Sequence, residues 1–200
     1  MQLQNSYWYF EKAVPEKICD EIVRYATSIK DKMAVTGHSG DPETLEEIKD
    51  LKKKRDSNVV WLNEAWIYRE VQPYVKLANK NAGWNFQWDH SEQLQFTKYN
   101  KGQYYTWHRD GFIKPNEHKK IRKLSVTLSL SDEKDYEGGE LEFDLGDIEP
   151  SQERAPRKCT EIRSKGSLVV FPSFIWHRVC PVTSGTRYSL VMWSLGGPFK

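Results

Sequence analysis

The chain has 200 residues, of which 38% are hydrophobic, and a formal net charge of +2. This length suits one domain with a single core, no apolar run approaches the ~20 residues that cross a bilayer, and the small charge neither demands nor excludes a nucleic-acid partner. Cys19, Cys159 and Cys180 form no CxxC pair, so a disulfide framework or zinc-thiolate site is not expected, and the absence of a secretory signal adds the prediction of a cytoplasmic protein.

The first part of the chain, to about residue 90, is predicted to be helical. Pro15 suits the first turn of a helix, and the apolar residues after it recur at helical spacing: Ile18, Cys19, Ile22, Val23 and Ala26. Residues 36–44 indicate a loop because of their Gly, Ser and Pro content, and 44–54 a short charged helix. The run KKKRD at 52–56 is interpreted as a solvated face, with a binding patch as the alternative.

A short strand and another helix are predicted next. Residues 59–62 have the composition of a strand, and Asn63 is the expected helix cap. Pro73 should kink or split the helix that follows, because its ring removes one hydrogen bond and crowds the preceding turn. One helical face is apolar, and it comprises Ile67, Val71, Tyr74 and Ala78.

From about Glu92 the hydrophobic period changes to two. Short segments such as QLQFTKY, KLSVTLSLS, GSLVVFPS and TRYSLVMWSL indicate successive strands separated by turn residues. Seven or eight such strands predict two antiparallel sheets that form a jelly-roll core over about 91–196. The expected fold is therefore mainly β with N-terminal helices (α+β), in a single domain of residues 1–200.

A metal site is suggested by His108 and Asp110. Residues i and i+2 of an extended segment point to the same face, so an imidazole and a carboxylate can converge there. His177 is the best third ligand. Two histidines and one carboxylate on one side of an octahedron form the ligand set of non-haem Fe(II) oxygenases. An HxD pair alone often occurs by chance; the other histidines, His38, His90 and His118, are expected at the surface.

Arg187, ten residues after His177, strengthens the iron hypothesis. A turn at 183–185 is predicted to bring the Arg187 strand alongside the His177 strand, with Arg187 pointing inward. A buried guanidinium needs an anionic partner. A dicarboxylate that chelates iron at one end and pairs with Arg187 at the other would provide it. Ser189 faces the same way and can add a hydrogen bond; a surface ion pair of Arg187 is the alternative.

These motifs together resemble the prolyl 4-hydroxylase-like branch of the 2-oxoglutarate oxygenases. The resemblance rests on His108-Arg109-Asp110 and on HRVCPVTSGTRYSLVMW, which runs from His177 to Trp193 and is particularly similar to the bacterial PKHD-type hydroxylases. The segments YNKGQYYTWHRD, SDEKDYEGGELEF and RDSNVVWL are similar to strands of prolyl hydroxylases. The resemblance covers residues 90–196 well and the helical part weakly.

The resemblance implies a double-stranded β-helix and a dioxygenase that uses Fe(II), 2-oxoglutarate and molecular oxygen, with ascorbate as an optional addition. It implies that Tyr99 contacts the co-substrate and that further residues line its pocket, namely Gln95, Leu141, Val179 and Trp193. Ser129 stands where animal prolyl hydroxylases place a tyrosine beside the arginine. This departure weakens the inference of a prolyl substrate but not that of iron, and Ser129 becomes a further candidate to assist Arg187.

The expected substrate is a prolyl residue of a peptide or protein, because of the branch resembled. A free small molecule such as an amino acid ranks second, and nucleobase repair ranks third because no groove for single-stranded nucleic acid is evident. A non-catalytic jelly-roll binding module is a further alternative, which the complete ligand set disfavours. Lys119, Lys120, Arg122 and Lys123 are interpreted as a solvated loop, with an acidic or phosphate-bearing substrate as the alternative.

Three secondary features complete the predictions. Gly138 and Gly139 mark a bulge or a close backbone approach. Trp107 and Trp176 precede ligand histidines, so strand alternation directs them away from the metal as packing residues. Residues 35–57 and 112–120 are predicted to form a mobile cover over the iron site, because they have few apolar anchors; ordinary surface loops are the alternative.

Overall fold

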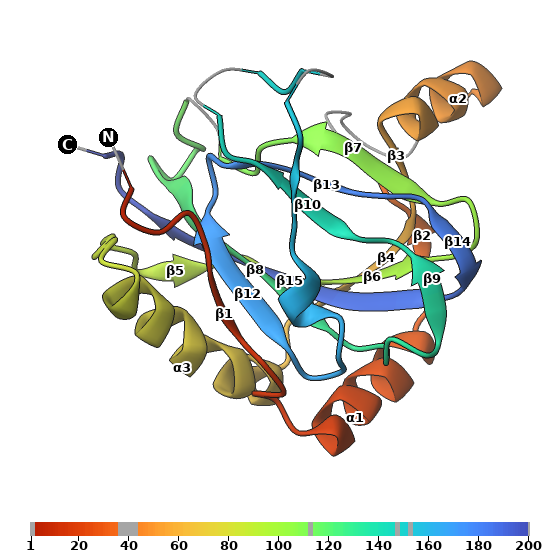
Figure 1. The fold of residues 1–200 in the computed structure, drawn as a ribbon, viewed down its shortest axis with the longest axis horizontal. Coiled ribbons are helices and arrows are strands. Elements are labelled where there is room, and N and C mark those ends of the chain that lie inside the picture. The colour runs from red at the N-terminus through yellow and green to blue at the C-terminus, as the bar shows by residue number, and fades with distance from the viewer. Residues whose placement is uncertain (1–2, 36–43, 112–113, 147–148, 152–153, 200) are drawn as a thin grey trace.

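The computed structural model describes residues 3–35, 44–111, 114–146, 149–151 and 154–199. Most regular elements are strands, with helices concentrated before residue 82 (Figure 1). In chain order the elements are β1 (Trp8–Phe10), α1 (Glu16–Thr27), β2 (Lys32–Met33), α2 (Leu45–Lys54), β3 (Arg55–Asp56), β4 (Asn58–Leu62), α3 (Ala65–Asn81), β5 (His90–Ser91), β6 (Leu94–Tyr99), β7 (Tyr104–His108), β8 (Ile121–Ser129), β9 (Tyr136–Gly138), β10 (Leu141–Asp144), β11 (Arg157–Lys158), a 3-10 turn (Thr160–Ile162), β12 (Leu168–Pro172), β13 (Trp176–Val179), β14 (Val182–Gly185) and β15 (Arg187–Gly196).

Two antiparallel sheets face each other. The eight-stranded sheet has the order β1-β12-β8-β15-β6-β4-β2, with β5 also paired to β15, and the five-stranded sheet has the order β11-β10-β13-β7-β3. Aromatic contacts join the two sheets, since the ring of Phe171 on β12 lies 4.9 Å from that of Phe143 on β10. The expected mainly β architecture with N-terminal helices is confirmed, and it places the ends of β7 and β13 against the inner face of the larger sheet.

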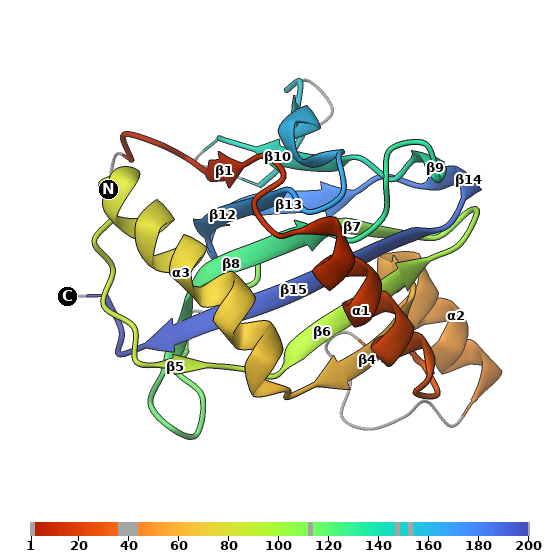
Figure 2. The same cartoon turned by 90° about the horizontal axis from the view of Figure 1, so that it is seen from below.

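Helices α1 and α3 lie across the outer face of the eight-stranded sheet (Figure 2). Their apolar stripes bury Ile22, Ile67 and Val71 in one core with outward-facing sheet residues such as Phe96 and Leu190. Because alternate residues of a strand point to opposite faces, the intervening residues of the same strands face the five-stranded sheet. Within the described residues, no helix is long and apolar enough to cross a membrane.

The start and the middle of α3 differ from expectation. Asn63 does not cap the helix: Glu64 occupies the cap position without a side-chain hydrogen bond, and the Asn63 side chain instead accepts a hydrogen bond from Tyr68. Pro73 does not split the helix, which runs from Ala65 to Asn81. Pro73 is exposed, so the carbonyl that loses its N–H partner is on the solvent side, where water can satisfy it.

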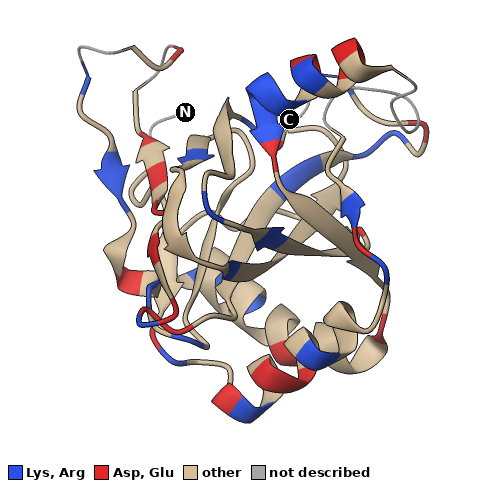
Figure 3. Cartoon of the chain, turned by 90° about the vertical axis from the view of Figure 1, so that its right-hand side faces the viewer, with Lys and Arg blue, Asp and Glu red and all other residues tan. Residues whose placement is uncertain are grey.

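Helix α2 was predicted as a charged helix, and this is confirmed. Thr44 forms a capping box with Glu47, which satisfies two backbone donors at the start of the helix. Acidic residues occupy the first turn and Lys52, Lys53 and Lys54 the last, as the red and blue ends of the helix show (Figure 3). This arrangement complements the helix dipole. The loop predicted at 36–44 lies outside the described residues except for Thr44.

The strand predicted at 59–62 is confirmed as β4, but the shorter strands β1, β2 and β3 of the N-terminal part were not predicted. β1 pairs with β12 and β4 pairs with β6, so residues before 90 extend the sheet rather than form a purely helical part. Strands of two or three residues are too short to show a period-two pattern. The assignment of residues 1–200 to one domain remains a prediction.

The connection between β13 and β15 also differs from expectation. Residues 183–185 belong to β14, which pairs with β9, and β15 then pairs with β6 and β8 in the other sheet. The Arg187 strand is therefore across from the His177 strand and not alongside it. The predicted close approach at the glycine pair is confirmed, because a Cβ atom at Gly138 would lie 2.3 Å from the carbonyl oxygen of Pro181.

Candidate metal centre

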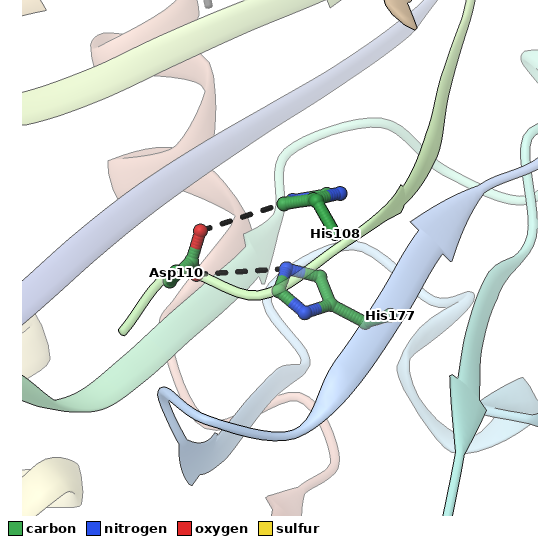
Figure 4. A group of neighbouring side chains, drawn as sticks. All are labelled: His108, Asp110 and His177. Atoms are coloured by element: carbon green, nitrogen blue, oxygen red, sulfur yellow. Dashed lines mark ion pairs between the residues drawn. The ribbon is translucent and has the colours of Figure 1, made fainter. Parts of the chain in front are cut away.

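His108, Asp110 and His177 converge between the two sheets (Figure 4). His108 ends β7 and is paired with His177 of β13, and Asp110 follows two residues later. The Nε2 atom of His108 lies 3.8 Å from Asp110 Oδ1, and that of His177 lies 3.5 Å from Asp110 Oδ2. One ligand atom from each residue falls within 4.8 Å of the others. The sequence spacing thus brings together the three side chains that were expected to meet.

Backbone contacts orient both imidazoles. His108 Nδ1 lies 2.8 Å from the carbonyl oxygen of Thr106, and His177 Nδ1 lies 3.0 Å from that of Ile175. A carbonyl only accepts, so each Nδ1 carries the proton and each Nε2 presents its lone pair. Ser125 donates to Asp110 Oδ2 at 2.7 Å. Such outer contacts are typical of metal sites, where they fix the ligands in the binding orientation.

The protonation states of the cluster also suit a metal ion. Burial, with a further contribution from His177, lowers the pKa of His108 to about 3. Burial opposes ionisation of Asp110, but the neighbouring His177 and His108 outweigh it and lower the pKa of Asp110 to about 2. Near neutral pH, His108 is therefore neutral and Asp110 ionised, as metal coordination requires. Two imidazoles and one carboxylate fit the ligand set of a non-haem Fe(II) site.

A cavity of about 370 Å³ extends from these three residues toward the interior of the sheet pair. The cavity is lined by most of the residues that were expected near the co-substrate: Gln95, Tyr99, Leu141, Val179, Arg187, Ser189 and Trp193. They come from strands of both sheets, so the cavity exists only when the two sheets are assembled. Its size is at the lower end of small-molecule sites.

Arg187 projects into this cavity from the start of β15. It is 3% exposed, donates to Ser189 Oγ at 3.1 Å, and lies 5.5 Å from the centre of the Tyr99 ring. A Cβ atom at Gly139 would lie 2.9 Å from Arg187 Cδ, so the glycine leaves room for the arginine. A buried guanidinium held by a hydroxyl and an aromatic ring is suited to bind an anion.

Ser129 is not among the residues that line this cavity. Its hydroxyl donates to the carbonyl oxygen of Ile162, and the residue borders a separate small cavity that also contacts Arg187. The accepting carbonyl belongs to the 3-10 turn (Thr160–Ile162) that precedes β12. Assistance of Arg187 by Ser129 stays a prediction. Thr127, two residues earlier on β8, faces the cavity instead.

Arg55 was interpreted as part of a solvated run, and this was wrong. The lysines Lys52, Lys53 and Lys54 are exposed as expected, but Arg55 is 6% exposed and lines the cavity. It begins β3, whose pairing with β7 places Arg55 opposite Tyr105. The only sequence signal was the step from a charged helix into the extended segment RDSNVVWL.

The basic cluster after the HxD motif is also only partly a loop. Arg122 and Lys123 belong to β8. Arg122 pairs with Glu92 and lies 3.9 Å from the centre of the Trp193 ring, and it lines the cavity. Lys123 is 4% exposed. The solvated-loop interpretation is therefore wrong for these two residues, because the strand begins earlier than their charge suggested.

The tryptophans beside the ligand histidines lie away from the cavity. Trp107 stacks with Arg178 at 4.7 Å, and Trp176 with Arg109 at 4.8 Å. The expected strand alternation explains this placement, since each tryptophan neighbours an inward-facing histidine. His90 and His118 are exposed, as expected; His38 is outside the described residues.

The two segments expected to cover the site lie partly outside the described residues, which omit 36–43 and 112–113. The described parts border the site: Val35 and Arg55 line the cavity, and Asn116 and Lys120 line an open trough of about 970 Å³. Trp61 borders both the trough and the cavity. A moving cover remains a prediction.

Comparisons with known proteins cover the β-rich part best. The family model for the 2OG-Fe(II) oxygenase superfamily matches residues 94–195. A PKHD-type hydroxylase of Synechococcus sp. strain CC9605 is 37% identical over 100 residues, which is 50% of this chain and 40% of that protein. A PKHD-type hydroxylase of Alteromonas mediterranea is 36% identical over 101 residues, 49% of this chain and 41% of that protein. The matched part thus spans about two fifths of these relatives.

Solved structures show the fold over nearly the whole chain. A viral collagen prolyl hydroxylase from Paramecium bursaria Chlorella virus-1 superposes with a TM-score of 0.65 at 18% identity, covering 96% of this chain and 97% of that one. A Pseudomonas putida prolyl-4-hydroxylase gives 0.64 at 18% identity, covering 94% and 91%. The expected double-stranded β-helix is confirmed by these neighbours.

Proposed function

This chain belongs to the 2OG-Fe(II) oxygenase superfamily, and from that membership we propose that it hydroxylates an unactivated carbon of a prolyl residue in a peptide or protein. One observation carries the proposal. A buried His-Asp-His cluster with both Nε2 atoms directed at the carboxylate shares its cavity with the buried guanidinium of Arg187. A metal site and an anion site in one cavity suit a co-substrate that chelates iron and carries a second carboxylate.

The prolyl substrate is supported by the relatives and not by the site alone. Two similar sequences are PKHD-type hydroxylases, and the similar structures include prolyl hydroxylases, one of them in complex with a peptide fragment of hypoxia inducible factor. The open trough beside Trp61 and His118 offers a surface on which an extended peptide can lie while one side chain enters the cavity.

His108, Asp110 and His177 would hold Fe(II). When bound, Fe(II) with 2-oxoglutarate supplies the oxidative chemistry that places one oxygen atom of O2 in succinate and the other in the substrate, with release of carbon dioxide. The protein's own contribution begins with orientation: the Thr106 and Ile175 carbonyls keep the Nδ1 protons in place, and the Ser125 hydroxyl holds the Asp110 carboxylate. These contacts preorganise the three ligands.

Arg187 would bind the distal carboxylate of 2-oxoglutarate, assisted by Ser189 and Tyr99. The guanidinium is already held by the Ser189 hydroxyl, so less conformational freedom is lost when the carboxylate binds. Leu141, Val179 and Trp193 line the same cavity and exclude water from the co-substrate. A dry site strengthens the ion pair and protects reactive species from side reactions.

The test is 2-oxoglutarate turnover to succinate in the presence of Fe(II) and ascorbate, across a panel of proline-containing peptides and free amino acids, with mass spectrometry of the products. We expect a proline-containing peptide to stimulate succinate formation and to gain one oxygen on the proline ring. Stimulation only by free amino acids would instead assign a small-molecule substrate. No succinate formation with any member of the panel, from a protein shown to bind Fe(II) and 2-oxoglutarate, would contradict the prolyl proposal.

A further inference from the structure

Arg55 is a second buried guanidinium in the cavity, and the proposed function does not use it. It lies at the edge of the five-stranded sheet and reaches across to the eight-stranded sheet. Its Nη2 donates to Gln95 Oε1 at 2.8 Å and its Nε donates to Ser57 Oγ at 2.8 Å. The guanidinium also lies 4.6 Å from the centre of the Tyr105 ring. All of these partners are neutral groups.

No carboxylate balances Arg55 within the part of the chain that the structure describes. Among the described residues that line the cavity, Asp110 is the one with a carboxylate, and its two oxygens face the imidazoles of His108 and His177. The neighbouring Asp56 is directed to Gln103 and Lys52. A buried cation without a counter-ion is costly, and a site that retains one is adapted to an anion that arrives from outside.

The proposed cofactors do not supply this anion. Fe(II) and the 2-oxoglutarate dianion carry equal and opposite charges, so their binding leaves the net charge of the cavity unchanged. Arg122, the other strand arginine at the cavity wall, already has the carboxylate of Glu92. Arg109 also lines the cavity, but it is exposed and stacks on Trp176. With Asp110 set against one of the two remaining buried cations, Arg55 and Arg187, one positive charge is left over.

Arg55 and Arg187 occupy different positions along β6. Arg187 is paired with Tyr99 at one end of that strand, whereas Arg55 is bonded to Gln95 near the other end. Four residues of a strand rise by about 13 Å. Gln95 is paired with Trp61, which borders both the cavity and the open trough. Arg55 is thus on the side from which a substrate enters.

We propose that Arg55 binds a carboxylate of the primary substrate, close to the carbon that is oxidised. The inference rests on the proposed function, and it restricts the substrate to an anionic one. The carboxylate can come from the α-carboxylate of a terminal or free proline, or from an acidic side chain next to an internal proline. Both sources present the same planar group to the guanidinium, which binds it through paired hydrogen bonds.

Two pairs of probes separate these sources and test the proposal without turnover. The full chain is loaded with Mn(II) and 2-oxoglutarate in the absence of oxygen, and binding is measured by calorimetry. The first pair is acetyl-proline and acetyl-prolinamide; the second is acetyl-Gly-Pro-Asp-amide and acetyl-Gly-Pro-Asn-amide. We expect the acid of at least one pair to bind about 30-fold or more tightly than its amide, the range typical of a buried charge pair that loses one partner. Equal binding of acid and amide in both pairs would overturn the proposal.

The variant Arg55→Gln tests whether Arg55 is the group that makes the acid bind more tightly than the amide. It should remove the preference for the acid, leave 2-oxoglutarate affinity within about threefold of wild type, and leave amide binding unchanged. Lys53→Gln removes an exposed charge two residues away and serves as the matched control that retains the preference. Loss of 2-oxoglutarate binding in Arg55→Gln would assign Arg55 to the co-substrate instead. The comparison of acid with amide measures only binding to the wild-type chain, so it does not depend on turnover. If the acid binds more tightly but no proline is hydroxylated, the proposed function is wrong while this inference stands.

Discussion

The two faces of the eight-stranded sheet are equally buried but chemically opposite. Beneath α1 and α3, strands β6, β8 and β15 present the apolar side chains Leu94, Phe96, Leu124, Val126, Leu128, Leu190 and Met192. Toward the five-stranded sheet, the alternate residues of the same strands are mostly polar or charged: Gln95, Thr97, Ser125, Thr127, Ser129, Arg187 and Ser189. Burial therefore does not distinguish a packing surface from a site in this protein; the polarity of the buried residues does.

The two faces of the sheet also differ in how much they contribute to stability. The outer face excludes water by close packing, and each apolar side chain contributes to stability. The inner face instead has buried charged groups, such as Arg187 and Asp110, that are suited to bind ligands and contribute little to apolar packing. A change on the inner face should therefore alter chemistry more than stability, and a change on the outer face should do the reverse. Substitutions on both faces of the sheet test this division.

Asp110→Ala should have the largest effect. Loss of the only carboxylate of the cluster should lower succinate formation by more than about 100-fold, beyond the loss typical of changing an outer partner of a metal site. His108→Ala and His177→Ala should behave in the same way. The measurement is turnover together with bound iron and far-ultraviolet circular dichroism. Asp50→Ala, at an exposed position of α2, is the control; near wild-type turnover in Asp110→Ala with unchanged iron content would contradict the ligand assignment.

Arg187→Ala should have the second-largest effect, and the effect should be on 2-oxoglutarate binding. An unpaired carboxylate in a buried site costs about 2–5 kcal/mol of binding, so 2-oxoglutarate affinity should fall by an order of magnitude or more while iron remains bound. Calorimetric titration of the iron-loaded variant measures this. An unchanged affinity would place the co-substrate elsewhere than at Arg187.

Val126→Ala tests the outer face. Val126 is 1% exposed, and removal of two buried methyl carbons should lower the free energy of unfolding by about 2 kcal/mol, with little change in the turnover of the folded protein. Urea denaturation and initial rates at low temperature check both expectations. A loss of turnover without a loss of stability would show that the two faces are not separate in function.

Ser189→Ala should have the smallest effect. It removes the hydroxyl that holds Arg187, worth about 1 kcal/mol or roughly fivefold in 2-oxoglutarate affinity. Ser184→Ala, at an exposed position of β14, is the matched control. If Ser189→Ala lowered 2-oxoglutarate affinity as much as Arg187→Ala does, the Ser189 hydroxyl and not the Arg187 guanidinium would be the main group that binds the co-substrate.

The sequence predicted those features that depend on local periodicity. The strand pattern of QLQFTKY and KLSVTLSLS fixes which residues share a face, and the spacing of His108 and Asp110 directs both to one point. The inward direction of Arg187 with Ser189 follows from the same rule. These predictions need only neighbouring residues, so a single sequence contains them.

Features that depend on distant partners were missed. Arg55 follows a charged helix, and only the pairing of β3 with β7 turns it into the cavity. The hydrogen bond that the Ser129 hydroxyl donates to the Ile162 carbonyl, in the turn at Thr160–Ile162, could not be predicted from the spacing of Ser129 either. The strand of Arg187 changes sheets after β14, which a short turn at 183–185 did not suggest. Each miss is a tertiary contact between segments far apart in the chain.

The central claim is that the inner face joins a metal site and an anion site in one ligand-binding cavity. Equilibrium binding of 2-oxoglutarate with and without Fe(II), under anaerobic conditions, tests this most directly, because a ligand that touches both sites must couple them. We predict that Fe(II) raises 2-oxoglutarate affinity at least tenfold in the wild type and has no such effect in His177→Ala. Equal 2-oxoglutarate affinity with and without Fe(II) in the wild type would contradict the account.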